Sequence, residues 1–220
     1  MSPTLYYHPL ASYCHKVLVA LYELGTAFEP RLIDLGNDAD RAALRALWPM
    51  MKFPVLNDHA RGRTVAESSV IIEYLDHHHA APHILIPRQW EAALDVRLWD
   101  RVFDHHVQGP MQEIVLDRLR AAGGDLPAQR AALGSAYHMI DERMAGRTWV
   151  GADAFSMADC AAAPALFYAG TVQPFPDACV QLRAYFDRLM ARPSVARVLE
   201  QAKPYFGMYP FAEAIPGAFR

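Results

Sequence analysis

The chain has 220 residues, 53% hydrophobic and 20% charged, with a formal net charge of −3 at pH 7. This length allows one large domain or two modest ones with buried cores. The slightly acidic balance disfavours binding to phosphate backbones, and no apolar run approaches the roughly 20 residues that span a bilayer. Cys14, Cys160 and Cys179 are an odd number of cysteines at spacings that suit neither a disulfide framework nor a zinc site. We therefore expect reduced thiols and a cytoplasmic protein.

The first 80 residues alternate strand-like and helix-like patterns. The pattern predicts the order βαβαββα, with elements over residues 4–8, 13–24, 28–35, 40–47, 55–58, 64–66 and 68–78. Gly25 is a suitable stop for the first helix. Two strands joined through a helix pair in parallel, whereas two strands joined by the short turn at Arg61-Gly62-Arg63 pair antiparallel. A mixed four-stranded sheet is predicted.

After Pro87 the strand signal stops. Helical spacing with almost no competing strand pattern covers residues 89–120, 127–145, 156–169, 178–190 and 194–202. Residues 80–87 contain two prolines and separate the two composition regimes, as a linker does. The sequence thus predicts an α/β domain over residues 1–83 and an all-helical domain over residues 84–220.

Pro54 stands at the start of a short apolar strand. Proline cannot donate to a sheet ladder, so it belongs at a strand start or edge. If the bond from Phe53 to Pro54 is cis, we expect the bend to leave the main chain of Val55 unpaired by the sheet and free to bind an extended peptide. Glu67 and Ser68 open the next helix, whose first amides favour a carboxylate. These features predict a small acidic peptide as the ligand.

Taken in order, these features resemble the cytosolic glutathione transferase family across essentially the whole chain. Residues 47–56 look like that family's loop into its cis-proline, and Glu67-Ser68 looks like its γ-glutamyl-binding pair. The run from Gly151 to Asp159 is similar to its folding motif in the helical domain, in which Ser156 caps a helix and Asp159 bonds back to the cap. The resemblance implies a thioredoxin-like first domain, glutathione as co-substrate without a metal, a homodimer and a role in detoxification.

The chemistry that the resemblance implies is ionisation of the glutathione thiol, because the thiolate is the nucleophile. Ser12, four residues before Lys16, resembles the serine of theta-like and related bacterial transferases; its alternative role is to cap the helix. Cys14 is the second candidate, because it could form a mixed disulfide with glutathione; its alternative role is that of a small buried side chain. Tyr7, at the end of the first strand, is the third candidate; its alternative role is packing in the sheet. His15 is expected at the surface.

The resemblance also suggests binding residues. Lys52 would approach the glycine carboxylate of glutathione, or else be a solvated loop charge. The bend at Phe53 and Pro54 would present the main chain of Val55 to the cysteinyl residue. Glu67 and Ser68 would bind the γ-glutamyl end.

Aromatic residues of the helical part are candidates for a pocket that binds an apolar electrophile. They are Trp99 and Phe103 on the long helix, and Tyr209 and Phe211 near the C-terminus. Core packing is the alternative for the helix pair. The histidine runs at residues 77–79 and 105–106 point to a solvated surface rather than a metal site, because consecutive helix residues do not share a face.

The preferred hypothesis is a transferase that ionises bound glutathione and adds its sulfur to an apolar electrophile. One alternative is a Cys14-dependent thiol reductase or peroxidase; the lack of a Cys-x-x-Cys pair argues against a two-cysteine cycle but not against a one-cysteine cycle. The other is a non-catalytic binding protein on the same scaffold, since a fold does not guarantee a function.

Overall fold

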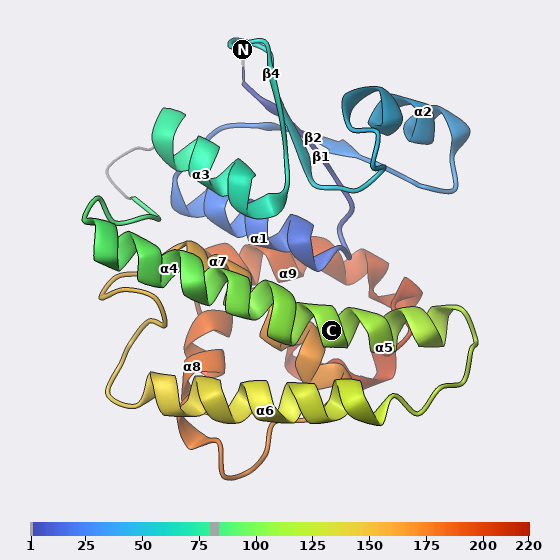
Figure 1. Ribbon diagram of the computed structural model, residues 1–220. Coiled ribbons are helices and arrows are strands. Elements are labelled where there is room, and N and C mark those ends of the chain that lie inside the picture. The colour runs from blue at the N-terminus through green and yellow to red at the C-terminus, as the bar shows by residue number, and fades with distance from the viewer. Residues whose placement is uncertain (1, 80–83) are drawn as a thin grey trace. The chain divides into compact units, whose positions relative to one another are not determined.

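The computed structural model describes residues 2–79 and 84–220. The chain divides into two compact units, here called unit 1 (Met1–Ile86) and unit 2 (Pro87–Arg220) (Figure 1). The predicted boundary after residue 83 adjoins residues 80–83, which lie outside the described residues, so that boundary stays a prediction. The predicted classes of the two parts, α/β and all-helical, are confirmed.

Unit 1 contains the predicted mixed four-stranded sheet. Its strands are β1 (Thr4–Tyr7), β2 (Glu29–Leu32), β3 (Val55–Asp58) and β4 (Arg63–Ala66), in the spatial order β2-β1-β3-β4. Strand β1 is parallel to β2 and antiparallel to β3, which is antiparallel to β4. Its helices are α1 (Ser12–Glu23), α2 (Asp38–Leu47) and α3 (Ser68–His78).

Both faces of this sheet are covered. Side chains alternate along a strand, so the register partners Leu5, Leu56 and Val65 share one face, and all three are buried. On the other face, Val55 packs in an apolar cluster with Leu44 of α2. Helices α1 and α3 pack against each other, and α3 also contacts β3 and β4 (Figure 1). The strand ends are therefore held by packing on both sides.

Unit 2 is built around one buried helix. Its helices are α4 (Trp90–Val102), α5 (Gly109–Leu119), α6 (Pro127–Met144), α7 (Met157–Val172), α8 (Val180–Met190) and α9 (Pro193–Ala202). Every residue of α7 except Gly170 is buried, as expected for a helix that is apolar all round, and α4, α5 and α8 contact it. In the part of the chain that the structure describes, no helix is long and apolar enough to cross a membrane.

The long helix predicted over residues 89–120 is not regular throughout. Helices α4 and α5 are joined by a π-helical segment, Phe103–Gln108. Pro110 has no N–H to offer the carbonyl of His106, so the α-helical ladder cannot continue there. The N–H of Gly109 instead donates to the carbonyl of Asp104, five residues back, which is the π-helical spacing.

Asp159 anchors the start of α7 in the way the sequence predicted. Its carboxylate accepts hydrogen bonds from the N–H and hydroxyl of Ser156, at 2.9 and 2.8 Å, which confirms the capping box. It also accepts from the N–H of Val150 at 3.2 Å and from the hydroxyl of Tyr185 at 2.6 Å. Burial raises the pKa of Asp159, and these hydrogen bonds oppose the rise. A Cβ at Gly151 would lie 3.1 Å from Ala158 and Val96, so this motif also needs a glycine.

Replacing Asp159 by alanine would leave four buried donor groups without their acceptor. We expect Asp159→Ala to lower the free energy of unfolding by about 3 kcal/mol. Urea unfolding followed by circular dichroism measures this loss. Asp153→Ala, at an exposed position of the same loop, is the matched control and should change the urea midpoint little. Equal midpoints for the two variants would contradict the anchoring role.

Candidate functional site

Three segments of unit 1 meet at one end of the sheet. In the strand register, Tyr6 lies opposite Val55, and Val55 lies opposite Ala66. Because neighbouring strands are about 4.8 Å apart, these residues form one row across β1, β3 and β4. The segments next to the row are therefore neighbours: the turn into α1 follows β1, Phe53 precedes β3, and the start of α3 follows β4.

The bend before β3 leaves the main chain of Phe53, and not that of Val55, outside the sheet. The bond between Phe53 and Pro54 is cis. Val55, however, has ladder partners on both sides, so the expectation that the sheet leaves it unpaired is not met. Phe53 lies before the ladder and belongs to no strand. The ring of His8 stacks on Phe53 with centroids 6.0 Å apart, which fixes the bend against the end of β1.

Glu67 holds an unusual backbone conformation at the start of α3. Its φ is +69°, in a region that side-chain-bearing residues rarely adopt, and such conformations cost about 1–3 kcal/mol. Glu67 is the N-cap residue, its side chain is exposed, and within the described residues that side chain caps no amide of α3. Ser68, the first residue of the helix, is buried. Strained residues of this kind are retained where surrounding structure holds them, often at ligand sites.

Ser12 and Tyr7 lie at the same end of the sheet. Ser12 is the first residue of α1 and 8% exposed, and the N-cap residue is Ala11, whose methyl group can cap nothing. Ser12 is therefore not the helix cap that the sequence offered as its alternative role. Its hydroxyl belongs to the first turn, where the helix dipole stabilises negative charge. Tyr7 ends β1 and is half-buried.

Cys14 and His15 are interior residues of α1. Cys14 is fully buried, and burial raises the pKa of its thiol to about 12, against a smaller opposing effect of a hydrogen bond with the His8 backbone. The Nε2–H of His15 donates to the carbonyl of Pro9. Burial lowers the pKa of His15 to about 4, so its ring is neutral at pH 7. The expectation of a surface His15 was wrong, because α1 is buried on nearly all its faces from Ser12 to Leu21.

Lys16 is a feature that the sequence analysis did not single out. It is 1% exposed, and its Nζ donates to the Oγ of Ser69, the second residue of α3, at 2.8 Å. This bond joins α1 to the first turn of α3. The available signal was the position of Lys16 immediately before the apolar run of residues 17–21, which is typical of a buried helix.

The remaining predicted residues fall into two groups. Lys52 is exposed, two residues before Pro54. In unit 2, Trp99, Phe103 and Tyr209 are buried, and the Tyr209 hydroxyl shares a hydrogen bond of 2.8 Å with the hydroxyl of Thr171. Phe211 is half-buried, with the guanidinium of Arg118 over its ring at 4.9 Å. Because Trp99, Phe103 and Tyr209 are buried, their rings pack in the interior of unit 2 and do not line an open pocket.

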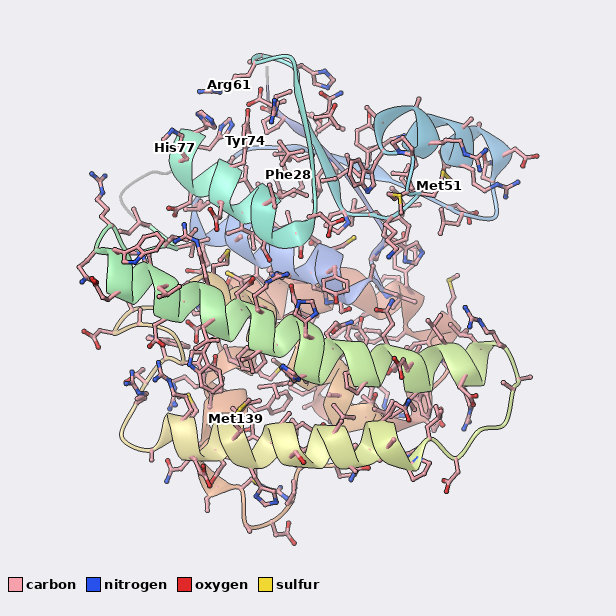
Figure 2. The ribbon with its side chains drawn as sticks, viewed as in Figure 1. Phe28, Met51, Arg61, Tyr74, His77 and Met139 are labelled. Atoms are coloured by element: carbon pink, nitrogen blue, oxygen red, sulfur yellow. The ribbon has the colours of Figure 1, made fainter. Side chains whose placement is uncertain are left out.

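A polar cluster occupies the opposite end of the unit 1 sheet. Buried Asp58 accepts hydrogen bonds from the Tyr74 hydroxyl at 2.9 Å and from His79 at 3.0 Å. Burial alone would raise the pKa of Asp58, but these bonds and one from the backbone of Arg61 lower it to about 2. Figure 2 shows Arg61, Tyr74 and His77 at this end. These hydrogen bonds tie the end of α3 to the β3–β4 turn. Among the described residues, no group of three or more His, Cys, Asp or Glu could hold a metal ion.

The burial of the cysteines leads to a labelling prediction. Cys14, Cys160 and Cys179 are all buried free thiols, and burial raises the pKa of both Cys14 and Cys179. We expect the folded protein to react slowly with iodoacetamide at pH 8 and to take up three equivalents once unfolded, as counted by mass spectrometry. One fast thiol in the folded protein, lost in Cys14→Ala, would be incompatible with a protonated Cys14.

Comparison with protein families gives matches in both units. A family model described as "Glutathione S-transferase, N-terminal domain" matches residues 5–83, and one described as "Glutathione S-transferase, C-terminal domain" matches residues 124–193. The chain is 30% identical to Glutathione S-transferase 2 of Saccharomyces cerevisiae over 151 residues, which are 63% of this chain and 64% of the yeast protein. That alignment spans less than two thirds of the yeast relative.

Solved structures show the same fold. The chain is similar to a glutathione S-transferase from Methylobacterium radiotolerans in complex with glutathione sulfonate, with a TM-score of 0.77 and 28% identity, covering 90% of this chain and 94% of that chain. A delta-class glutathione transferase of Nilaparvata lugens gives a TM-score of 0.85 at 19% identity, covering 97% and 100% of the two chains. At that identity the likeness concerns the fold alone.

Proposed function

This chain belongs to the glutathione S-transferase family, and we propose that it binds glutathione at the end of the unit 1 sheet and transfers the glutathione sulfur to an apolar electrophile. The observation that carries the proposal is the row formed by Tyr6, Val55 and Ala66. The row brings together a helix turn that can stabilise a thiolate, main chain outside the sheet and a helix start that can bind a carboxylate. Glutathione presents a matching thiol, peptide main chain and carboxylate.

Each part of glutathione has a chemically suited partner. The γ-glutamyl carboxylate would accept hydrogen bonds from Ser68 and the first amides of α3. The exposed carboxylate of Glu67 is suited to the γ-glutamyl ammonium. The main chain of Phe53 would pair with the cysteinyl residue, in place of the Val55 main chain. Lys52, exposed before the bend, suits the glycine carboxylate.

This arrangement directs the glutathione sulfur toward the first turn of α1. There the thiol releases its proton to water, and the Ser12 hydroxyl donates a hydrogen bond to the thiolate. The sulfur lone pair forms a C–S bond to an electrophilic carbon, and the leaving group departs with its bonding electrons. Lowering a thiol pKa from about 8.5 to about 7 takes about 2 kcal/mol, which one hydrogen bond to an anion and a helix dipole can supply.

The Cys14-dependent reductase is the weaker alternative. A mixed disulfide requires a thiolate that can reach a disulfide sulfur. Cys14 is fully buried and its thiol pKa is raised to about 12, which opposes both requirements.

Three free buried cysteines suit a reducing compartment, so we place the transferase in the cytoplasm.

Comparing Ser12→Ala with Cys14→Ala tests the catalytic assignment. With chlorodinitrobenzene as electrophile, Ser12→Ala should lower kcat/KM by about 10- to 100-fold, the value of one hydrogen bond to an anion. Its pH profile should shift to higher pH, because the bound thiol loses a donor. Cys14→Ala should keep kcat/KM within about threefold, since its thiol is a packing group. Tyr7 is the remaining candidate. Tyr7→Phe removes only its hydroxyl, so the kcat/KM of this variant measures the contribution of that group.

Other outcomes identify other functions. Loss of disulfide reductase activity in Cys14→Ala, with Ser12→Ala unaffected, would support the reductase. A calorimetric titration of the wild-type protein with glutathione that releases no heat would support the non-catalytic binding protein and remove the proposed function.

We further propose that the protein is a homodimer. Trp90, Leu94 and Leu98 recur every four residues along α4 and expose 65%, 51% and 55% of their surface. Residues at this spacing share one helix face, so α4 presents a row of large apolar side chains. Contiguous exposed apolar surface marks protein interaction sites. A second copy of the chain is the partner that the family suggests.

Sedimentation analysis tests the dimer. The wild-type protein should sediment at twice its chain mass of 24.6 kDa. Leu94→Glu should produce monomers, because it places a charge in the apolar row. Met139→Glu makes the same kind of change at an exposed position of α6 (Figure 2) and should leave the dimer intact. A monomeric wild-type protein would show that α4 does not join two copies.

A further inference from the structure

His8 lies between two segments of unit 1 that the proposed site uses, the start of α1 and the bend before β3. It is the first residue after β1, and the turn from His8 to Ala11 leads directly into Ser12, the first residue of α1. The side chain of His8 is half-buried and contacts both that turn and Phe53. One side chain therefore touches the segment proposed to hold the sulfur and the segment proposed to hold the cysteinyl main chain.

A ring nitrogen of His8 shapes the turn into α1. The N–H of Leu10 donates to Nδ1 of His8 at 3.2 Å. Asn and Asp side chains accept from the N–H two residues on in the same way, in an Asx turn, so the imidazole here takes the place of a side-chain oxygen. The carbonyl of His8 also accepts from the N–H of Ala11, at 3.1 Å. These bonds hold the chain between the end of β1 and Ser12.

The bond to Leu10 also determines where the ring carries its proton. A backbone N–H can only donate, so Nδ1 of His8 is an acceptor and carries no proton. Burial lowers the pKa of His8, and the nearby Asp34 opposes this by a smaller amount. The ring is therefore neutral at pH 7, and its effect on a bound thiolate is through position and not through charge.

The face of the same ring contacts the bend before β3. The rings of His8 and Phe53 stack, with centroids 6.0 Å apart and planes at 21°. Phe53 precedes the strand ladder, so the hydrogen bonds of the sheet begin only after it. Aromatic pairs are attractive beyond the area that they bury. The stacked ring thus restricts a main chain that the sheet does not hold.

We propose that His8 is a positioning residue of the glutathione site, whose Nδ1 sets the turn that carries Ser12 and whose ring face sets the main chain of Phe53. This inference rests on the proposed function. His8 is assigned no contact with the reacting atoms. Through Nδ1 it lowers the pKa of the bound thiol, and through its ring it strengthens the binding of the peptide. The two effects are separable, because they come from different parts of the imidazole.

Two substitutions separate these effects. His8→Phe keeps a ring that can stack on Phe53 and removes the acceptor for the N–H of Leu10. His8→Asn removes the ring and supplies an oxygen that can accept from the same N–H. The pKa of bound glutathione is measured from the ultraviolet absorbance of its thiolate against pH. Affinity is measured by calorimetry with S-methylglutathione, whose sulfur carries no proton, so that ionisation does not enter.

His8→Phe should raise the pKa of the bound thiol by about 0.5 to 1 and change the affinity for S-methylglutathione by less than about twofold. His8→Asn should weaken that affinity by about three- to tenfold and leave the pKa of the bound thiol unchanged. His77→Phe and His77→Asn are the matched controls, at an exposed histidine at the opposite end of the sheet (Figure 2), and should change neither quantity.

Equal changes of both quantities in the two His8 variants would show that the ring is a packing group only, and the inference fails. Each variant also decides alone if the other does not fold: an unchanged thiol pKa in His8→Phe, or an unchanged affinity in His8→Asn, overturns the inference. A wild-type protein that binds neither glutathione nor S-methylglutathione is a separate result, since it removes the proposed function itself.

Discussion

The pairing of Val55 with Tyr6 on one side and Ala66 on the other is the constraint on which the proposed glutathione site depends. A slip of one residue along β3 would turn its side chains to opposite faces. That slip is prevented on both faces, because Leu56 is buried on one and Val55 packs with Leu44 on the other. Ordinary core packing thereby fixes the place where three functional segments meet.

The site's electrostatics are local and do not follow from the chain as a whole. The chain carries a net charge of −3, yet the starts of two helices create positive potential at the end of the unit 1 sheet. Interactions in a protein interior are screened less than those in water, so the amides of these two helix starts count for more than distant surface charges. An acidic protein can in this way hold a ligand with two carboxylates.

The parts predicted well from the sequence are those with local markers. Pro54 marks the start of β3, and the step from Glu67 to Ser68 marks the start of α3, and both elements have the bounds predicted for them. Errors arose where long-range packing decides. The burial of His15, which was expected at the surface, follows from packing that encloses α1 on nearly all sides, and helix periodicity, which assumes one solvated face, cannot show that. The ladder partners of Val55 likewise depend on strands that are distant in sequence.

Ser12 and Cys14 show how magnitudes decide between neighbouring candidates. Both lie in the first turn of α1 and experience the same helix dipole, which contributes up to about 2 kcal/mol toward a negative charge. Burial moves the thiol pKa of Cys14 from 9.0 to about 12, a change of about 4 kcal/mol in the opposite direction. For this thiol burial outweighs the dipole, so the sulfur of Cys14 stays protonated. A ligand sulfur held outside the core beside Ser12 gains the dipole and the hydroxyl without that loss, so the proposed transfer takes its nucleophile from glutathione and not from Cys14.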